Sequence, residues 1–260
     1  MWHRYSGGSE GYRCDGGLLT RVVAAMLTVA LLLGSVCLAE GVHTSQGVYN
    51  PEVAPPNPVE HEPTDNDYFT DAVFVGDSMM EYVELLGEIP TANYVWKIGM
   101  GPATVGIKQF RVRGQEQNLS AYEMIATYNP GKVYIMLGGN GLDWSSYTVV
   151  IENYEIMMDT MVEMFPDAMF YVISAPPASQ ALLTEKGVPV GRFTEFNRAL
   201  KEMAERRGFY YLDLYSLLAD ANGYLPAQYD SGDGYHLSTA AYRILVDLVR
   251  RTTVPYPTQE

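Results

Sequence analysis

Short apolar runs alternate with longer segments of helical periodicity from residue 71 onward, and this alternation restricts the possible folds strongly. The apolar runs predict five buried strands, at residues 72–75, 94–98, 132–137, 169–174 and 209–212. The longer segments predict helices at residues 79–86, 119–128, 147–165, 193–207 and 238–251. We therefore expect an α/β protein with a parallel five-stranded sheet between two helical layers, joined by right-handed crossovers.

A parallel sheet of this kind binds ligands at the carboxyl ends of its strands. Glycine-rich loops follow the second and third predicted strands, at residues 99–102 and 138–141, and a third such loop precedes the last helix, at residues 230–236. We expect residues that carry chemistry to lie in these loops and in the turn after the first strand.

The turn after the first predicted strand contains Gly76, Asp77 and Ser78. A serine here lies at the carboxyl end of a strand and at the amino terminus of a helix, which favours developing negative charge on its oxygen. Asp and Ser are also common helix caps, so capping alone is an alternative explanation of this tripeptide.

His236 is the sole histidine of the predicted globular part, because His43 and His61 precede it in a proline-rich segment. It follows Asp233 by three residues, and within a turn this spacing can place a carboxylate against one imidazole nitrogen while the other nitrogen faces outward. Serine hydrolysis needs that arrangement. A purely structural role for the pair stays open.

Asn140 follows two glycines at the end of an apolar strand, where a tight turn alone would explain the sequence. Its side-chain amide could also donate to an oxyanion, as could a backbone N–H at Gly101 or Gly99. Loss of one such donor typically costs about a hundred- to thousand-fold in turnover.

Taken in order, these motifs resemble the blocks of the SGNH, or GDSL-like, hydrolase family over residues 71–249. The matching segments are 75–78 for the first block, Gly101 for the second, 138–140 for the third and 233–236 for the fifth. Two positions depart from the family pattern. Met79 replaces the leucine that usually follows the serine, and Gly141 replaces a frequent aspartate, for which Asp143 is a possible substitute.

The resemblance implies a flavodoxin-like SGNH hydrolase fold and a two-step acyl transfer without a metal or cofactor. It implies Ser78 as nucleophile, His236 as base and then acid, and Asp233 as the residue that orients His236. It also implies an oxyanion hole formed by the backbone N–H groups of Ser78 and Gly101 and by the side chain of Asn140, with Gly99 competing for the Gly101 role. The acidic residues Glu81, Glu84 and Glu88 are more simply a solvated helix face than a metal site.

Three segments divide the chain. Arg4, Arg13 and Arg21 precede an uncharged apolar run at residues 22–39, which predicts a signal peptide or a membrane anchor within residues 1–39. Residues 40–67 are acidic and proline-rich, which predicts an extended linker. Residues 68–255 form the predicted hydrolase domain.

Cysteine usage and charge exclude several functions. Both cysteines, Cys14 and Cys37, lie in the first 39 residues, so the rest of the chain can form no disulfide and has no thiolate nucleophile or metal ligand. From Glu40 onward, 14 basic residues face 29 acidic ones. Such a domain repels nucleic acid and anionic lipid headgroups. Contact with a membrane is therefore expected only through the amino-terminal apolar run.

We therefore expect an exported or membrane-tethered serine esterase acting on a small acyl ester, with O-acetyl groups on carbohydrate as the favoured substrate. A lipase, lysophospholipase or thioesterase, or an O-acyltransferase using the same site, is the main alternative. A non-catalytic carbohydrate-binding or scaffold domain is a third. The sequence predicts no oligomeric state.

Overall fold

The computed structural model describes residues 42–44, 47–49, 58–111, 118–143 and 145–255. The apolar run at residues 22–39 and most of the linker lie outside these residues. Within the described part of the chain, no helix combines the length and apolar character needed to cross a membrane.

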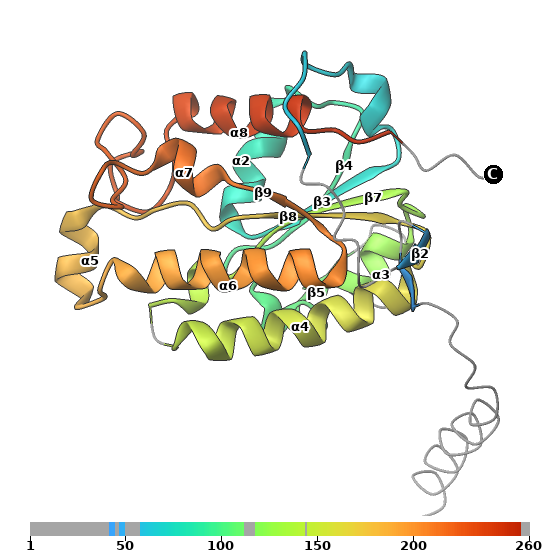
Figure 1. Cartoon of the computed structure of the whole chain (residues 1–260), viewed down its shortest axis with the longest axis horizontal. Coiled ribbons are helices and arrows are strands. Elements are labelled where there is room, and N and C mark those ends of the chain that lie inside the picture. Colours follow the sequence, from blue (N-terminus) through green and yellow to red (C-terminus); the bar gives the residue numbers. More distant parts are fainter. Residues whose placement is uncertain (1–41, 45–46, 50–57, 112–117, 144, 256–260) are drawn as a thin grey trace, which may run out of the picture. The chain divides into compact units, whose positions relative to one another are not determined.

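One five-stranded parallel sheet forms the centre of the domain (Figure 1), in the order β4, β3, β7, β8, β9. Its strands are β3 Ala72–Gly76, β4 Asn93–Trp96, β7 Lys132–Met136, β8 Met169–Ile173 and β9 Tyr210–Leu212. From β3 the chain adds β4 on one side and then returns to place β7 on the other. The strand order thus reverses between β3 and β7, and such a switch point opens a crevice at the carboxyl edge.

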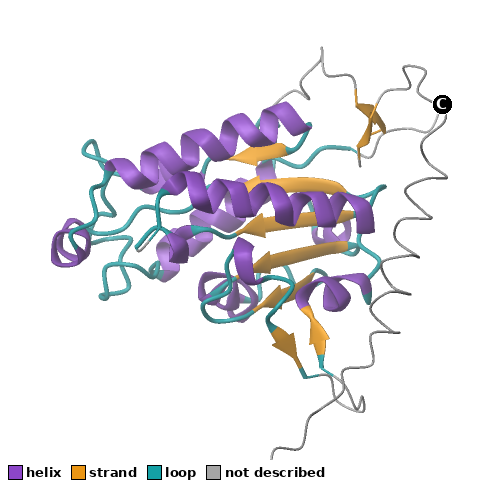
Figure 2. Ribbon diagram, turned by 90° about the horizontal axis from the view of Figure 1, so that it is seen from below, coloured by secondary structure: helices purple, strands orange, loops and turns teal. Residues whose placement is uncertain are grey.

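Helices cover both faces of the sheet, as Figures 1 and 2 show, which confirms the predicted three-layer α/β/α sandwich. On one face pack α3 Ala121–Ala126, α4 Tyr147–Met164 and α6 Gly191–Arg207. On the other pack α2 Ser78–Leu86, α7 Leu214–Leu218 and α8 Thr239–Arg251. Strands β3, β7, β8 and β9 are buried along their whole length, which is why they appear in the sequence as continuous apolar runs, whereas the edge strand β4 is only partly buried.

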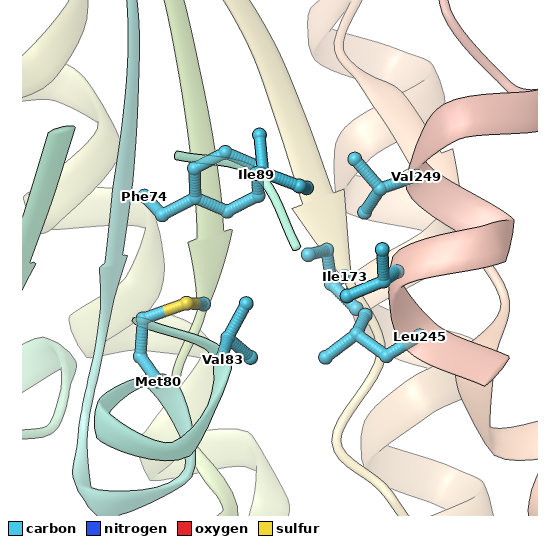
Figure 3. A pocket seen from close by; sticks show the side chains of 8 residues that line it. Phe74, Met80, Val83, Ile89, Ile173, Leu245 and Val249 are labelled. Carbon is cyan, nitrogen blue, oxygen red and sulfur yellow. The ribbon is translucent and has the colours of Figure 1, made fainter. Parts of the chain in front are cut away.

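Aromatic rings cross the sheet on the face that α2 and α8 cover. Each strand contributes one ring at the same level, and adjacent rings lie 4.3–5.4 Å apart between centroids, in the order Tyr94, Phe74, Tyr134, Tyr171, Tyr210. Beside this ladder, side chains of α2, β8 and α8 point toward one another, including Val83, Ile173 and Leu245 (Figure 3). The space between them does not admit a water molecule, so this region is packed core.

Several shorter elements were not predicted from the sequence. They are the 3₁₀ turns η1 Asn66–Phe69, η2 Pro102–Thr104 and η3 Gly139–Gly141, helices α5 Gln180–Lys186 and α7, and two antiparallel hairpins, β1 Val42–Thr44 with β2 Gly47–Tyr49 and β5 Gln109–Phe110 with β6 Leu119–Ser120.

Most predicted boundaries differ from the structure by one or two residues, and two of these differences have a clear local cause. The second strand ends at Trp96, two residues early, and Gly99 then adopts a positive φ of 67°. The helix predicted from residue 119 begins at Ala121, because Ser120 caps it: the Ser120 hydroxyl accepts from the backbone N–H of Glu123, whose carboxylate accepts from the N–H of Ser120.

The part of the predicted linker that the structure describes at residues 58–67 binds the carboxyl end of α8. The backbone N–H groups of His61 and Thr64 donate to the carbonyl oxygens of Arg251 and Arg250 at 2.9 and 3.0 Å. These carbonyls have no partner within the helix, so the incoming chain satisfies acceptors that a helix end leaves open.

Candidate active site

Ser78 lies at the first position of α2, directly after β3, at the switch point of the sheet. Gly76 permits this sharp strand-to-helix turn, because a Cβ there would lie 2.5 Å from the Cβ of Met80. Asp77 caps the helix, with its Oδ1 accepting from the N–H of Met79 at 2.9 Å. The N–H of Ser78 has no acceptor among the described residues, so it remains available at the helix terminus.

The structure brings Ser78, His236 and Asp233 into one hydrogen-bonded line. The Ser78 Oγ lies 2.9 Å from the His236 Nε2, and the His236 Nδ1 lies 2.6 Å from the Asp233 Oδ2. Because an ionised carboxylate only accepts, Nδ1 carries the proton and Nε2 accepts from the serine hydroxyl. In this tautomer the imidazole is able to take a proton from Ser78.

The loop that carries Asp233 and His236 is fixed by its own hydrogen bonds. The Asp233 Oδ1 accepts from the backbone N–H groups of Tyr235 and His236 at 2.9 and 2.8 Å. Gly232 and Gly234 adopt positive φ angles of 113° and 81°, and both N–H groups donate to Asp230. The three-residue spacing therefore places the carboxylate against Nδ1, as the sequence predicted.

Asp233 is strongly acidic in this setting. Desolvation is the largest single effect and raises its pKa, but hydrogen bonds from the His236 ring and from the N–H groups of Tyr235 and His236, with the attraction of His236, together lower it to about 2. The carboxylate is thus charged throughout the neutral range and stabilises a protonated His236.

Asn140 lies in η3, after β7, and its side chain contacts Asp77 in the turn before α2. Its Nδ2 donates to the Asp77 Oδ2 at 2.6 Å, and the Tyr235 hydroxyl lies 3.5 Å from its Oδ1. These two contacts fix which end of the amide is the donor. One of the two N–H bonds of Nδ2 is used by Asp77, and the other is left for a ligand.

Asp77 is an ionisable group inside the fold, with 4% of its surface exposed. Burial raises its pKa to about 6, against the lowering effects of the Met79 N–H and of His236. At neutral pH it is the charged acceptor for Asn140.

Gly101 is close to the site, but its N–H is occupied in this structure. It donates to the Thr104 Oγ1 at 3.0 Å, within the turn that starts η2. The N–H of Gly99 has no acceptor among the described residues. For Gly101 to donate to an oxyanion, the Thr104 hydroxyl has to rotate away, so the competition between Gly99 and Gly101 stays open.

The two departures from the family pattern have structural explanations. Met79 is 4% exposed and packs in the core, where its volume resembles that of leucine. A Cβ at Gly141 would lie 3.0 Å from Val150, which leaves little room for an aspartate. Asp143 pairs with Lys186 and makes no described contact with Asn140.

Two residues of the site were missed from the sequence alone. Asp77 was interpreted only as a cap, although it also anchors Asn140, and Tyr235 was passed over between Asp233 and His236. Tyr235 packs tightly: a Cβ on Gly139 would lie 2.7 Å from its hydroxyl, and its ring meets His236 edge-on. The sequence did contain an indication that Asp77 belongs to the site, because its carboxylate stands between an apolar strand and the candidate nucleophile.

No group of three or more His, Cys, Asp and Glu side chains with the arrangement of a metal site occurs among the described residues. The imidazole of His236 and the carboxylates of Asp77 and Asp233 are joined to a serine and an amide rather than gathered around a common centre.

A serine with a hydrogen-bonded histidine at the carboxyl edge of a flavodoxin-like sheet is typical of a class of ester hydrolases. The chain belongs to the GDSL-like Lipase/Acylhydrolase family, whose family model matches residues 67–244.

Solved structures of similar fold include relatives of this class. A GDSL-like lipase from Bacteroides thetaiotaomicron is 16% identical, with a TM-score of 0.55 over 70% of this chain and 87% of that chain. A protein described as an acylhydrolase from Bacteroides fragilis is also 16% identical, with a TM-score of 0.55 over 75% of this chain and 88% of that one. At this identity the likeness concerns the fold. Among curated proteins, no relative matches this chain.

Proposed function

We propose that this ester hydrolase is a serine esterase in which Ser78 is the nucleophile, His236 the general base and acid, and Asp233 the group that orients and stabilises His236. The observation that carries the proposal is the line from the Ser78 Oγ through both nitrogens of His236 to Asp233, with distances of 2.9 and 2.6 Å.

In the first half of the reaction, the Ser78 oxygen bonds to the ester carbonyl carbon and its proton passes to the His236 Nε2. The tetrahedral intermediate then breaks its bond to the alcohol oxygen, which takes the proton from His236. In the second half, water gives a proton to His236 and adds to the acyl carbon. Ser78 then leaves, regains the proton and releases the acid.

The oxyanion of each intermediate lies between donors from separate elements. The Ser78 N–H and the remaining N–H bond of Asn140 are available, and the Gly101 N–H joins them once Thr104 rotates. Asp77 and Tyr235 act as positioning residues, because they hold the Asn140 amide without touching the reacting atoms.

For the substrate we propose a small uncharged ester, with O-acetyl groups on carbohydrate as the first class to test. The excess of acidic over basic residues in the chain supports this choice, because it disfavours anionic lipid surfaces. Export or anchoring at the outer face of the cell membrane is proposed from the apolar run at residues 22–39. Fractionation of cells that produce the full chain tests it, and recovery in the cytosolic fraction alone would contradict it.

Hydrolysis of p-nitrophenyl acetate tests the chemistry, with a serine-directed fluorophosphonate probe as a second readout. We expect turnover and labelling in the wild type, and loss of both in Ser78→Ala. The control is Ser216→Ala, since Ser216 lies near the start of α7 and bonds Asp213, away from Ser78. Labelling without hydrolysis would favour an acyltransferase. Neither labelling nor hydrolysis in folded protein would favour the non-catalytic binding module.

A further inference from the structure

A cleft of about 190 Å³ that is open to solvent lies beside the proposed oxyanion hole, between η2 and the first turns of α4. Gly99, Gly101 and Asn140 line its inner end. Its walls are formed by Pro102, Ala103 and Thr104 on one side and by Ser145, Val149, Val150 and Asn153 on the other.

The position of the cleft indicates which half of an ester it receives. The tetrahedral carbon holds the Ser78 oxygen, the oxyanion, the leaving oxygen and the acyl carbon. His236 must reach the leaving oxygen, so the alcohol lies on the histidine side. The cleft is lined by residues of the oxyanion hole but by none of Ser78, Asp233 and His236, so it lies on the remaining side. That side belongs to the acyl carbon.

The length of the cleft exceeds what an acetyl group needs. Within α4, Val149 and Asn153 line the cleft four residues apart, which corresponds to about 6 Å along the helix, and Ser145 continues the lining before the helix begins. An extended chain advances about 1.2 Å per bond, as follows from about 3.5 Å for the three bonds of one residue. An acetyl methyl group would occupy only the inner end.

The lining of the cleft selects an uncharged chain. Pro102, Ala103, Val149 and Val150 supply apolar surface, and no ionisable side chain lines the cleft. A charged acyl group would lose water there without gaining a partner. The inner end of the cleft is empty beside Gly99 and Gly101, since a Cβ on either residue would meet no atom within 4 Å. A larger side chain at either position would fill this space.

We propose that this cleft is the acyl subsite of the enzyme and that it accepts neutral acyl chains of about four to eight carbons. The proposal rests on the proposed esterase function and extends its substrate class beyond acetyl. Val149 is the residue that controls access along the helical wall, with 44% of its surface exposed to the cleft and solvent.

The test uses the full chain and p-nitrophenyl esters from acetate to octanoate. Each methylene taken into an apolar site raises kcat/KM by about fourfold at most. We therefore expect hexanoate to exceed acetate by at least tenfold in the wild type. Val149→Trp fills the cleft, so it should lower the hexanoate-to-acetate ratio by at least tenfold. Ala103→Leu, which approaches from the opposite wall, should lower the ratio in the same direction.

Ile156→Trp is the matched control. Ile156 lies two turns further along the same face of α4, is 65% exposed and does not line the cleft, so its ratio should equal that of the wild type. A wild-type rate that falls steadily from acetate to octanoate would overturn the proposal. So would an effect of Val149→Trp that follows the size of the alcohol, because the cleft would then hold the alcohol half.

Failure of the acyl subsite is distinguishable from failure of the esterase function. If Ser78 is labelled by the fluorophosphonate and acetate is hydrolysed, but chain length and Val149→Trp have no effect on the ratio, only the subsite is refuted. If no ester is hydrolysed and Ser78 is not labelled, the esterase function itself is refuted.

Discussion

Asp77 and Ser78 are adjacent in the chain but lie in different environments. The Asp77 carboxylate is buried between the N–H of Met79 and the amide of Asn140, whereas the Ser78 hydroxyl faces His236. The start of α2 therefore supplies the proposed nucleophile, Ser78, and the carboxylate of Asp77 that holds the amide of Asn140, a proposed oxyanion donor. This arrangement requires a buried charge, and a buried charge has a cost in stability.

The cost of the Asp77 charge predicts a pH dependence of stability. The native pKa of Asp77 is about 6 and the ordinary pKa of an aspartate is 3.8, so the folded state binds the proton more tightly than the unfolded chain does. The contribution of this group to the free energy of unfolding therefore falls as pH rises from about 4 to about 6, by about 3 kcal/mol. Asp77→Asn should gain that amount relative to the wild type between pH 4 and pH 7, in urea unfolding at both values. A pH-independent difference would contradict this expectation.

Asp233→Asn should lower kcat by about 10³- to 10⁴-fold. The asparagine Oδ1 can still accept from the N–H groups of Tyr235 and His236, but its Nδ2 forces the His236 Nδ1 to become an acceptor. The Nε2 then carries the proton and cannot take one from Ser78. Steady-state kinetics at pH 7 measures the loss.

Asp230→Asn is the control for that substitution. Asp230 lies in the same loop and also accepts from two backbone N–H groups, those of Gly232 and Gly234, but it does not contact His236. Its kcat should stay within about threefold of the wild type. Equal losses in the two variants would show that loop geometry, rather than the histidine tautomer, sets the rate.

The sequence predicts the site residues whose partners are close in the chain. Asp233 and His236 are separated by one turn, so their contact follows from spacing. Asp77, Tyr235 and Thr104 were not predicted as partners of site residues. The first two depend on contacts with Asn140 across 63 and 95 positions. The third, Thr104, is only three residues from Gly101, so its hydrogen bond with the Gly101 N–H is a local contact that was missed from the sequence alone.

Among the single elements, the turn after β7 tolerates substitution least, because its backbone angle and its close packing both require glycine. Gly138 has a φ of 110°, and a Cβ there would lie 2.5 Å from the Cζ of Phe196, which is buried in α6. Positive φ and close approach both require glycine at this position. The turn aims Asn140, so its shape affects both stability and the proposed oxyanion hole.

Gly138→Ala should lower the free energy of unfolding by about 3 kcal/mol, from backbone strain and overpacking against Phe196 together. It should also lower kcat, because Asn140 follows two residues later. Gly87→Ala separates backbone strain from overpacking, because Gly87 has a φ of 67° but an added Cβ would meet no atom within 4 Å. This variant should lose only about 1 kcal/mol of the free energy of unfolding. Denaturant unfolding of both variants gives the comparison, and equal losses would refute the contribution of Phe196.

The longer helices were predicted with small boundary errors, whereas the short elements were not. Helices α4, α6 and α8 span several turns, so their periodicity is visible. Helices α5 and α7 have seven and five residues, too few to show a repeat. The start of α3 was misplaced because residues Leu119 and Ser120 pair with β5, and strand pairing is set by the partner rather than by local preference.

The two edges of the sheet have different roles in the molecule as a whole. The carboxyl edge carries Ser78, and the amino edge carries an ion pair between Lys132 and Asp71. Lys132 is 1% exposed, and its ammonium also lies 4.4 Å from the ring centroid of Tyr68. The buried ion pair and the proposed catalytic residues thus lie at opposite ends of the strands, about one strand length apart.

Asp71→Asn should therefore destabilise the protein without altering catalysis. Removing the negative charge that compensates the buried Lys132 should lower the free energy of unfolding by about 3 kcal/mol. The kcat/KM for p-nitrophenyl acetate should change less than twofold. Asp247→Asn, which removes an exposed pair with Arg251, should lose less than about 0.5 kcal/mol. Urea titration and steady-state rates of both variants test the separation.

The architecture followed from the sequence because four of the five strands are fully buried and each crossover contains a helix. The strand order did not follow in the same way. Placement of β4 on one side of β3 and β7 on the other depends on contacts between elements distant in the chain, such as the pairing of Ala72 with Lys132.

The aromatic ladder gives the protein a built-in optical reporter. Stacked rings of Tyr134 and Tyr171, 4.3 Å apart and 10° from parallel, share one asymmetric environment with rings from the other three strands. Their near-ultraviolet circular dichroism therefore depends on all five strands being in register, and it disappears when fixed side-chain packing is lost. A single wavelength near the tyrosine band reports whether a variant has kept its sheet intact.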